Sequence, residues 1–394
     1  MAELYSLPNG WEWKKLRDKV VCELIMGQSP SSDTYNSDGI GIPFFQGKTE
    51  FGEIYPRVSK YCTTPNKIAQ IGDILLSVRA PVGPTNIANI ECCIGRGLGA
   101  IRPNSKNTLT NYLLYFFRNF EIEISNKGKG STFPAITKKE LEEINIPLPP
   151  LEEQKRIVVN LDNLFAKIDK AIALHQKNID EADIFMASVL NDVFVELEEK
   201  SEIKRLNECF IVKDGTHDSP KYIEDGYPLF TSKNLKDYGL DTSNFNSINK
   251  EDYDNINKRS KVDKGDLLFA MIGTIGNPTI VNFEPNFAIK NVALFKPLNE
   301  ESIMTYLRYY FMSEKTITKM KNEANGATQK FVGLTYLREF PFPFIDVKTQ
   351  QKVVSYLDEI SQKMEKIKNL QKEKMQSLKE LKASILDKAF KGEL

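Results

Sequence analysis

The chain has 394 residues, of which 41% are hydrophobic and 27% are charged. These shares are typical of a soluble globular protein, and the length predicts two or three domains. No apolar run approaches the roughly 18–20 residues that a membrane span needs, and the N-terminus lacks the profile of a secretory signal. Five cysteines without a C-x-x-C pair argue against a disulfide framework or a zinc cluster, so we expect a reducing, cytoplasmic location.

The charges balance, with 53 basic and 53 acidic residues. This balance argues against a histone-like protein that binds nucleic acid through bulk positive charge. It leaves open sequence-specific binding through a few local basic positions. The order of motifs along the chain is therefore more informative than the net charge.

Residues 1–146 predict a small α+β module. Short β-like runs such as 74–78 alternate with Gly, Pro and Asn turns, and an apolar-aromatic helix is predicted over 111–119. We interpret its aromatic residues as core rather than as a base-stacking platform, and they are Tyr112, Tyr115, Phe116 and Phe117. A loop at 128–132 and a Pro-rich stop at 146–150 follow.

A long helix is predicted from Leu151 to about Glu199, because this stretch contains neither Gly nor Pro. Its apolar residues recur at alternating steps of three and four, the heptad pattern of a coiled coil. The seam positions are Phe165, Ile168, Ile172, Ile179, Ala182, Met186, Val189 and Val193. His175 falls on this seam, and we interpret it as a packed polar residue rather than a metal ligand. Two amphipathic helices, each packed on its own domain, are the alternative.

Residues 200–343 repeat the first module. The matching segments keep their order at nearly constant separation, which predicts two copies of one fold. In order, they are 42–48 with 227–233, 72–76 with 265–269, 100–103 with 294–297, 112–117 with 306–311, and 128–132 with 325–328.

A second long helix is predicted from Asp346 to about Phe390. Its seam positions are Ile360, Met364, Ile367, Leu378, Leu381 and Ile385. The order module, helix, module, helix predicts an antiparallel intramolecular helix pair and a pseudo-twofold relation between the modules. A helix of about 45 residues would be about 65–70 Å long. That length corresponds to on the order of twenty base pairs of B-DNA.

Several motifs resemble the specificity subunits of Type I restriction–modification systems, over essentially the whole chain. The loop 128–132, with Leu141 and the segment 144–157, is similar to the family's junction between a target-recognition domain and a spacer helix. The segments 27–30, with Tyr35, and 214–220 resemble loops at the start of such domains. The second junction, 342–351, lacks the Leu-Pro-Pro-Leu-Glu-Glu form, although Gln350 falls where Gln154 does. This departure leaves open whether the two ends make equal contacts.

Together with the repeat, the resemblance implies an α+β fold class. Two similar globular target-recognition domains would be separated by a long antiparallel two-helix coiled coil with pseudo-twofold symmetry. The predicted boundaries are 1–146 for the first target-recognition domain, 147–199 for the first spacer helix, 200–343 for the second domain and 344–394 for the second spacer helix.

The resemblance also implies a sequence-specific DNA-binding subunit that is not itself an enzyme. Each domain would read one half of a bipartite, asymmetric site, and the helix pair would set the unread gap. The predicted partners are double-stranded DNA and two methyltransferase (modification) subunits, with restriction (nuclease/translocase) subunits as further candidates and no membrane. No cofactor or metal is predicted on this chain, since S-adenosylmethionine and ATP are expected on the partner subunits.

Candidate DNA-binding residues are donors and acceptors placed in the predicted loops, because base edges and phosphates accept such groups. In the first module they are Ser29, Ser31, Tyr35, Gln46, Lys48, Arg79, Lys127, Lys129, Ser131 and Thr132. In the second they are Thr216, His217, Ser219, Lys221, Tyr222, Lys233, Asn234, Asn325, Thr328, Gln329 and Lys330. For each residue, an ordinary solvated loop position is the alternative.

Catalytic motifs are missing from the sequence. It contains no G-x-G-x-x-G nucleotide fingerprint and no Walker A motif. The segment 277–280 lacks the second proline and the aromatic residue of an amino-methyltransferase tetrad, and 346–348 matches only half of a nuclease motif. Two alternatives stay open: a divergent DNA methyltransferase or nuclease, and a coiled-coil scaffold with two protein-binding modules.

Overall fold

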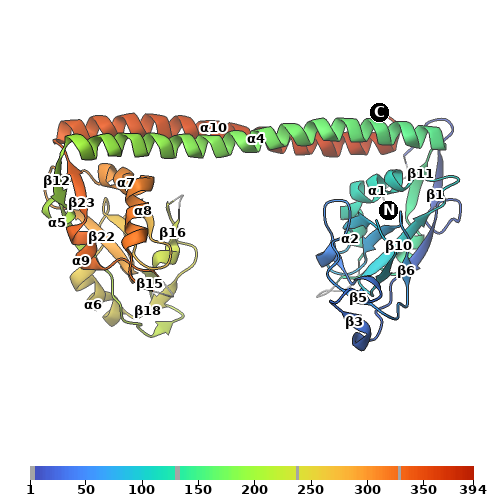
Figure 1. Cartoon of the computed structure of the whole chain (residues 1–394), viewed down its shortest axis with the longest axis horizontal. Helices are drawn as coiled ribbons and strands as arrows, with labels where there is room; N and C mark the ends of the chain where they lie inside the picture. Colours follow the sequence, from blue (N-terminus) through green and yellow to red (C-terminus); the bar gives the residue numbers. More distant parts are fainter. Residues whose placement is uncertain (1–4, 129–133, 237–238, 327–329) are drawn as a thin grey trace. The chain divides into compact units, whose positions relative to one another are not determined.

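A computed structural model of the chain shows two compact units (Figure 1). Unit 1 consists of Met1–Leu174 with Glu373–Leu394, and unit 2 consists of His175–Lys372. Each unit contains one α+β module and a stretch of each of two long helices, so the predicted α+β class with two similar modules is confirmed. The residues that the structure describes are 5–128, 134–236, 239–326 and 330–394.

The two long helices are α4 (Leu151–Lys200) and α10 (Val347–Lys391). Neither contains Gly or Pro, so the backbone hydrogen bonding of each helix can run without a break. Among the described residues, neither these nor any other helix is long and apolar enough to cross a membrane.

In unit 1 the two helices run antiparallel. Arg156, near the start of α4, donates from Nη2 to the carbonyl oxygen of Leu394 (2.7 Å), and Asp169, farther along α4, pairs with Lys382 (2.7 Å). A later position on α4 therefore meets an earlier position on α10. The ammonium of Lys382 also lies 4.7 Å from the ring centroid of the buried Phe165.

Unit 2 shows the same antiparallel direction. The ring of His175 hydrogen-bonds to Gln371, and Asp183 pairs with Lys368 at 3.0 Å. His175 is half-buried against the opposite helix, so its interpretation as a packed polar residue of the seam is confirmed.

The predicted apolar seam is confirmed in part. Buried positions of the two helices include Leu161, Phe165, Ile168, Ile179, Ala182, Leu190, Phe194, Leu357, Leu386, Ala389 and Phe390. The prediction was wrong for Ile367 and Leu381, whose side chains are 39% and 48% exposed. Where a helix has a single neighbour, a position just off the facing stripe is left to solvent.

The module of unit 1 contains a four-stranded antiparallel sheet in the order β2-β10-β7-β8 and a second sheet in the order β3-β5-β4-β9-β6. The strands of the first sheet are β2 (Cys22–Met26), β10 (Leu98–Pro103), β7 (Ile74–Ser77) and β8 (Thr85–Ile87). Those of the second are β3 (Tyr35–Asn36), β5 (Tyr61–Cys62), β4 (Ile42–Phe45), β9 (Cys92–Ile94) and β6 (Ile68–Ala69). The remaining elements are the pair β1 (Glu12–Lys15) with β11 (Asn145–Leu148), and α1 (Thr110–Asn119), α2 (Glu121–Lys127) and α3 (Lys138–Glu142).

The module of unit 2 repeats this plan. Its four-stranded sheet has the order β13-β22-β19-β20, and its second sheet has the order β14-β18-β15-β21. The strands are β13 (Phe210–Asp214), β22 (Val292–Pro297), β19 (Leu267–Ala270), β20 (Gly276–Ile280), β14 (Tyr222–Ile223), β18 (Asn246–Ile248), β15 (Tyr227–Phe230) and β21 (Ala288–Ile289). The remaining elements are β12 (Glu202–Arg205) paired with β23 (Pro341–Phe344), β16 (Leu235–Lys236) paired with β17 (Gly239–Leu240), and α5 (Leu206–Cys209), α6 (Lys250–Ser260), α7 (Met304–Met312), α8 (Glu314–Glu323) and α9 (Leu334–Glu339).

The four-stranded sheet of each module separates two cores. In β7, Ile74 and Leu76 join the core that contains α1 and the long helices, whereas Leu75 joins the core under the second sheet. In β19, Leu267 likewise faces the first core and Leu268 the second. Successive strand residues point to opposite faces, so a fully apolar strand needs cover on both sides.

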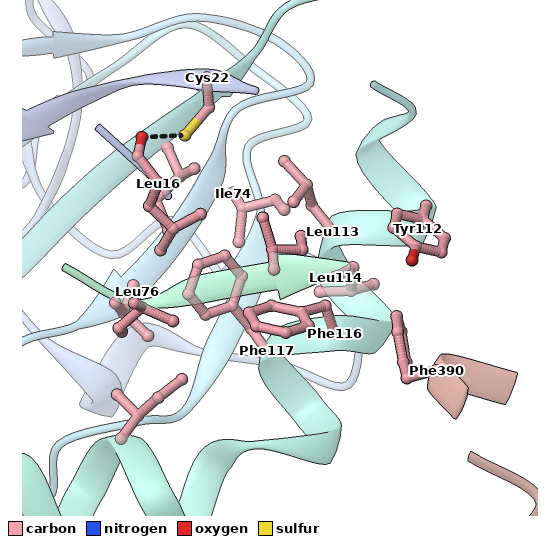
Figure 2. Close-up of a cluster of buried hydrophobic side chains, with 14 of the residues drawn as sticks. Leu16, Cys22, Ile74, Leu76, Tyr112, Leu113, Leu114, Phe116, Phe117 and Phe390 are labelled. Carbon is pink, nitrogen blue, oxygen red and sulfur yellow. Dashed lines mark hydrogen bonds between the residues drawn. The ribbon is translucent and has the colours of Figure 1, made fainter. Parts of the chain in front are cut away.

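Aromatic residues connect the module of unit 1 to the last turns of α10. Figure 2 shows Phe390 facing α1, with ring centroids 5.2 Å from Tyr112 and 5.7 Å from Phe116. The hydroxyl of Tyr112 donates to the carbonyl oxygen of Pro147 at 2.6 Å. Tyr112, Phe116 and Phe117 are buried, which confirms their prediction as core, while the half-buried Tyr115 donates to Asp162 of α4.

Unit 2 uses the last turns of α4 in the same way. The ring of Phe194 lies 5.5 Å from that of Tyr306 and 5.4 Å from that of Tyr310. Tyr306 donates to the carbonyl oxygen of Pro343 at 3.0 Å, the counterpart of the bond from the first module's aromatic helix. Each module core is thus completed by a helix that starts after the other module.

The two helix starts are anchored by equivalent glutamines. Gln154 donates to the carbonyl oxygens of Asn107 (2.8 Å) and Pro149 (2.9 Å), and its Oε1 accepts from the backbone of Leu109. Gln350 donates to Glu301 and Ile345 in the same manner, but its buried Oε1 has no partner among the described residues. The anchors therefore correspond, and their contacts are unequal.

A close backbone crossing follows the first strand of each four-stranded sheet. A Cβ on Gly27 would lie 2.2 Å from the carbonyl oxygen of Gly95 and 2.6 Å from that of Leu98. A Cβ on Gly215 would lie 2.2 Å from the carbonyl oxygen of Ile289. Only glycine allows this approach without displacing the backbone, which explains the glycine in both predicted loops.

We predict that Phe390→Ala opens unit 1 selectively. The substitution removes a buried ring from the core of α1, so the free energy of local opening there should fall by about 3 kcal/mol. Hydrogen exchange of the α1 amides measures this change. Leu381→Ala, an exposed position on the same helix, is the control and should leave exchange unchanged. Equal exchange in both variants would contradict the assigned packing.

Gly27→Ala should disrupt the backbone crossing of the first module. The new methyl group would overlap two carbonyl oxygens, so the unfolding free energy should drop by about 1–3 kcal/mol. Chemical denaturation measures the loss, and exchange of the Gln28 amide, which donates to Ile94 at 3.0 Å, reports the site. Gly47→Ala is the matched control, because the space around that glycine is open and its backbone is extended. Similar losses in both variants would rule out the steric explanation.

Candidate nucleic-acid interface

Three loops meet at each backbone crossing, and we call each such meeting a loop junction. In the first module they are 27–31, 46–48 and 95–97. Gln28 donates from its backbone to Ile94 (3.0 Å), and Gly95 donates to Phe45 (2.8 Å). The backbone N–H of Arg96 donates to the Oγ of Ser29 (3.2 Å).

The loop junction of the second module consists of 215–219, 231–233 and 290–291. Its backbone bonds match those of the first: Thr216 donates to Ile289 (3.0 Å), and Lys290 donates to Phe230 (2.8 Å). The hydroxyl of Ser232 adds a bond to the carbonyl oxygen of Asn291 (3.1 Å). In both modules the loops are therefore held by backbone bonds, which leaves most of their side chains free to differ.

The first loop junction brings together five of the predicted residues. Ser31, Gln46 and Lys48 are exposed, and Ser29 is half-buried beside Arg96. Tyr35 has a supporting role, because its hydroxyl donates to the carbonyl oxygen of Pro30 (2.7 Å) and its ring stacks on Phe44 at 4.5 Å.

Of two further predicted residues of the first module, Arg79 lies beside this junction and Lys127 does not contact it within the described ranges. Arg79 is exposed and follows Val78, whose backbone N–H donates to Gly97 at 2.9 Å. Lys127 is exposed at the end of α2, and no contact connects it to the junction within the described ranges. Lys129, Ser131 and Thr132 lie outside the described residues.

The second loop junction contains a polar network around His217. One ring nitrogen of His217 lies 2.8 Å from Oδ2 of Asp214, and the other lies 2.8 Å from Oδ1 of Asn291. Arg259 of α6 reaches the same loop, donating to the carbonyl oxygen of Gly215 at 2.8 Å. His217 is exposed but is held on both sides, so its position is well defined.

Most other predicted residues of the second module are exposed, and two of these predicted residues also make hydrogen bonds within the loop junction. Ser219 is exposed and accepts from Nζ of Lys290 at 2.6 Å, while Thr216 is half-buried and its Oγ accepts from the backbone of Asp218. Lys221, Tyr222 and Lys233 are exposed.

Asn234 is 5% exposed, unlike its neighbours. Its Nδ2 donates to the carbonyl oxygens of Asp241 (3.0 Å) and Asn244 (2.8 Å), and its Oδ1 accepts from the backbone of Thr231 (3.0 Å). These bonds give Asn234 a role in holding the loop rather than in presenting an amide to solvent.

Of the last predicted residues of the second module, the structure describes Asn325 and Lys330, and both are exposed. Asn325 pairs with Phe331 through two backbone hydrogen bonds, and Lys330 donates from Nζ to the carbonyl oxygen of Lys321 at 3.0 Å. The backbone of Gly273, between β19 and β20, donates to the carbonyl oxygen of Lys330 at 3.1 Å. Thr328 and Gln329 lie outside the described residues.

The repeated Gly-Asp segments support the sheets rather than the interface. Asp73 is buried and accepts two hydrogen bonds from Arg102, at 3.0 and 2.9 Å. Its counterpart Asp266 pairs with Lys296. Burial raises the pKa of Asp266, while Lys296 opposes that effect, and the bond to Asp73 raises the pKa of Arg102.

Possible metal ligands and cysteine thiols form no site in the described part of either junction. Within the described ranges, no group of three or more His, Cys, Asp or Glu residues could hold a metal ion. All five cysteines are buried and free of disulfides, and burial raises the pKa of the Cys22 thiol to about 12. The junctions instead present hydroxyls, amides and cations on fixed backbones, a combination suited to base edges and phosphates.

Sequence reasoning missed Arg96 and Lys290. Arg96 follows β9, which pairs in parallel with β4, and Lys290 follows β21, which pairs in parallel with β15. The two residues therefore occupy closely related places in the two junctions. The strands β9 and β21 end at Ile94 and Ile289, so the available signal was the matching order of the strands rather than shared residues. Neither Arg96 nor Lys290 lies in a segment where the two modules share obvious sequence.

Comparisons with known proteins agree with this architecture. The MjaX specificity subunit of Methanocaldococcus jannaschii is 43% identical over 190 residues, which cover 48% of this chain and 44% of that protein. The chain thus spans less than half the length of that relative. The type I restriction enzyme MjaIX specificity subunit of the same organism is 26% identical over 429 aligned residues, covering 100% of this chain and 95% of that protein.

Among solved structures, the HsdS subunit from Thermoanaerobacter tengcongensis has a similar fold, with a TM-score of 0.58 and 22% identity over 100% of this chain and 99% of that one. A family model described as "Type I restriction modification DNA specificity domain" matches residues 8–181 and 198–375, one match for each module with its helix. The chain therefore belongs to the family of Type I restriction–modification DNA specificity domains.

Proposed function

We propose that this chain is the sequence-reading subunit of a Type I restriction–modification complex. Each module reads one half of a bipartite DNA site. One observation carries the proposal: both modules build the same loop junction from matching backbone bonds, yet they present different side chains. The first offers Ser29, Gln46 and Arg96, while the second offers His217 and Lys290.

A common frame with different side chains suits the reading of an asymmetric sequence. Phosphate contacts from cations position a protein on the duplex, and amides or hydroxyls read base edges in the grooves. Because the two modules differ at nearly every exposed junction position, their half-sites should differ as well. A scaffold for two protein partners would not require this combination of cations and exposed polar groups.

The helix pair, in this proposal, sets the unread gap and docks two methyltransferase subunits. Large apolar side chains that remain exposed on α4 and α10 support a docking role, since such residues commonly mark partner surfaces. They include Val159, Leu174, Ile184, Phe185 and Leu370, which are 50–68% exposed. Restriction subunits would join the same complex.

The proposal leaves S-adenosylmethionine and ATP to the partner subunits, and the chain itself is not an enzyme. The matched family supports this division, because its model describes a DNA specificity domain. Binding of labelled S-adenosylmethionine to the isolated chain would contradict this assignment and favour a divergent methyltransferase.

Selection from a randomised duplex library with the full-length chain should enrich one asymmetric, interrupted motif. Changing the enriched gap by one base pair should then weaken binding about tenfold or more. Each added base pair rotates one half-site by about 35° relative to the other, so both modules cannot stay in register. A fluorescence titration with duplexes of altered gap measures the loss. Equal affinity at all gap lengths would refute the spacing role.

Exchange of residues 1–146 for the first module of another family member should change one half-site only. The loop junction of the first module is built entirely from residues of that segment, so the second half-site and the gap should persist. Repeating the selection with the chimaera reads out both halves at once. A change in both half-sites would show that the modules do not read independently.

A further inference from the structure

The second module contains a polar hollow beside its loop junction. Its volume is about 720 Å³, and it opens next to the 231–233 loop. Its polar lining includes the cations Lys233 and Lys236, the amides of Asn244, Asn246 and Asn277, the hydroxyl of Thr274 and one carboxylate, Asp241, whose pKa is lowered mainly by its bonds to Ser243 and further by the charge of Lys236. Such a density of amides, hydroxyls and cations on one concave surface distinguishes it from the apolar pockets typical of small-molecule sites.

Buried contacts hold the backbone that forms this hollow. Asn234 binds the carbonyl oxygens of Asp241 and Asn244, at 3.0 and 2.8 Å. On the opposite side, Asn277 donates from Nδ2 to the carbonyl oxygen of Leu235 at 2.9 Å. The ring of Phe245 packs on Phe230 at 5.8 Å between centroids. The segment 244–246 is therefore fixed from beneath rather than by its own polar side chains.

Four of the polar side chains above this support make no hydrogen bond or ion pair with a described residue: Asn244, Asn246, Lys233 and Lys236. Asn244 and Asn246 are exposed, and neither side-chain amide has a hydrogen-bond partner among the described residues. In the same part of the chain, the ammonium groups of Lys233 and Lys236 form no hydrogen bond or ion pair with a described residue. Asn234 provides the contrast, since both ends of its amide are used.

An asparagine amide carries an acceptor and a donor side by side. This pattern matches N6 and N7 of adenine in the major groove, where asparagine and glutamine bind in a bidentate manner. Lysine ammonium groups beside such amides suit the adjoining phosphates, which fix the register of the protein on the duplex. The hollow supplies both kinds of contact within one surface.

The first module lacks this pair of amides. Its corresponding connection, residues 47–60, contains no asparagine and carries Glu50, Glu53 and Arg57 instead. Asn86 ties that connection in place through two hydrogen bonds with the backbone of Gly52, at 3.0 and 3.1 Å. A buried asparagine thus holds the loop in both modules, and the fold does not require Asn244 or Asn246.

We propose that Asn244 and Asn246 read adenine-containing base pairs of the second half-site in the major groove, with Lys233 and Lys236 on the flanking phosphates. The inference rests on the proposed function and adds to it the half-site, the residues and the base. It also assigns a division of labour, because the amides determine sequence while the cations determine affinity.

The test is to substitute each asparagine with aspartate in the full-length chain. Aspartate offers acceptors alone and pairs with N4 of cytosine, so Asn246→Asp and Asn244→Asp should each shift preference from A·T to C·G at one position. Selection from a randomised duplex library should show a shift of about tenfold at that position, with the first half-site unchanged. Asn207→Asp, at an exposed position of α5, makes the same charge change outside the hollow and should enrich the original motif.

Alanine variants separate affinity from specificity. Lys233→Ala and Lys236→Ala should weaken binding to all sequences alike and lower the slope of log affinity against log salt by about one each. Asn246→Ala should instead relax the preference at a single position. Circular dichroism and thermal melting of every variant confirm that the fold is retained.

The outcomes distinguish two failures. If wild-type protein enriches an interrupted motif and both aspartate variants enrich the same motif, the assignment of Asn244 and Asn246 is overturned while the proposed function stands. If the wild-type protein enriches no interrupted motif, the proposed function itself fails. A shift in the first half-site would also overturn the assignment, because it would show that Asn244 and Asn246 do not act on the second half-site.

Discussion

The completion of each module core by a distant helix end is the contact on which the rest of the structure depends. Phe390 enters the core of α1 in unit 1, and Phe194 enters the core of α7 in unit 2. Each aromatic belongs to the last turns of a long helix whose start is anchored by Gln154 or Gln350 on the other module. Neither module can therefore reach its full core from a continuous stretch of sequence, and both helices must be present for either unit to be whole.

This dependence divides each module into a constant side and a variable side. The face of the four-stranded sheet toward α1 or α7 is occupied by aromatic packing and by the tyrosine bonds to Pro147 and Pro343. The opposite face carries the second sheet and the loop junction, where matching backbone bonds set the shared geometry and side-chain bonds differ between the modules. Because Gly27 and Gly215 meet the same steric demand, side chains around them can change without loss of the frame.

The sequence predicted most of the frame and little of the surface. Two modules, two long helices and an antiparallel pair follow from repeats and periodicity, because buried positions tolerate few residue types. Exposed positions lack that constraint, so Arg96 and Lys290 went unnoticed, and Asn234 was grouped with its exposed neighbours although it is buried. Ile367 and Leu381 fit the heptad but are exposed, since a sequence period does not say how wide a stripe one neighbouring helix covers. The candidate DNA-binding residues stay predictions.

Of the 53 basic and 53 acidic residues, some are paired within the modules and others are exposed in the loop junctions. Several cations are neutralised within the frame, as Arg102 is by Asp73 and Lys296 by Asp266, and they add no long-range attraction for DNA. Lys48 and Lys233 are exposed in the loop junctions instead, and neither forms an ion pair with a residue that the structure describes. A protein whose cations are balanced by an equal number of acidic residues gains little from sequence-independent attraction to phosphate. Under the proposed function, DNA affinity would therefore depend on contacts from both loop junctions rather than on net charge.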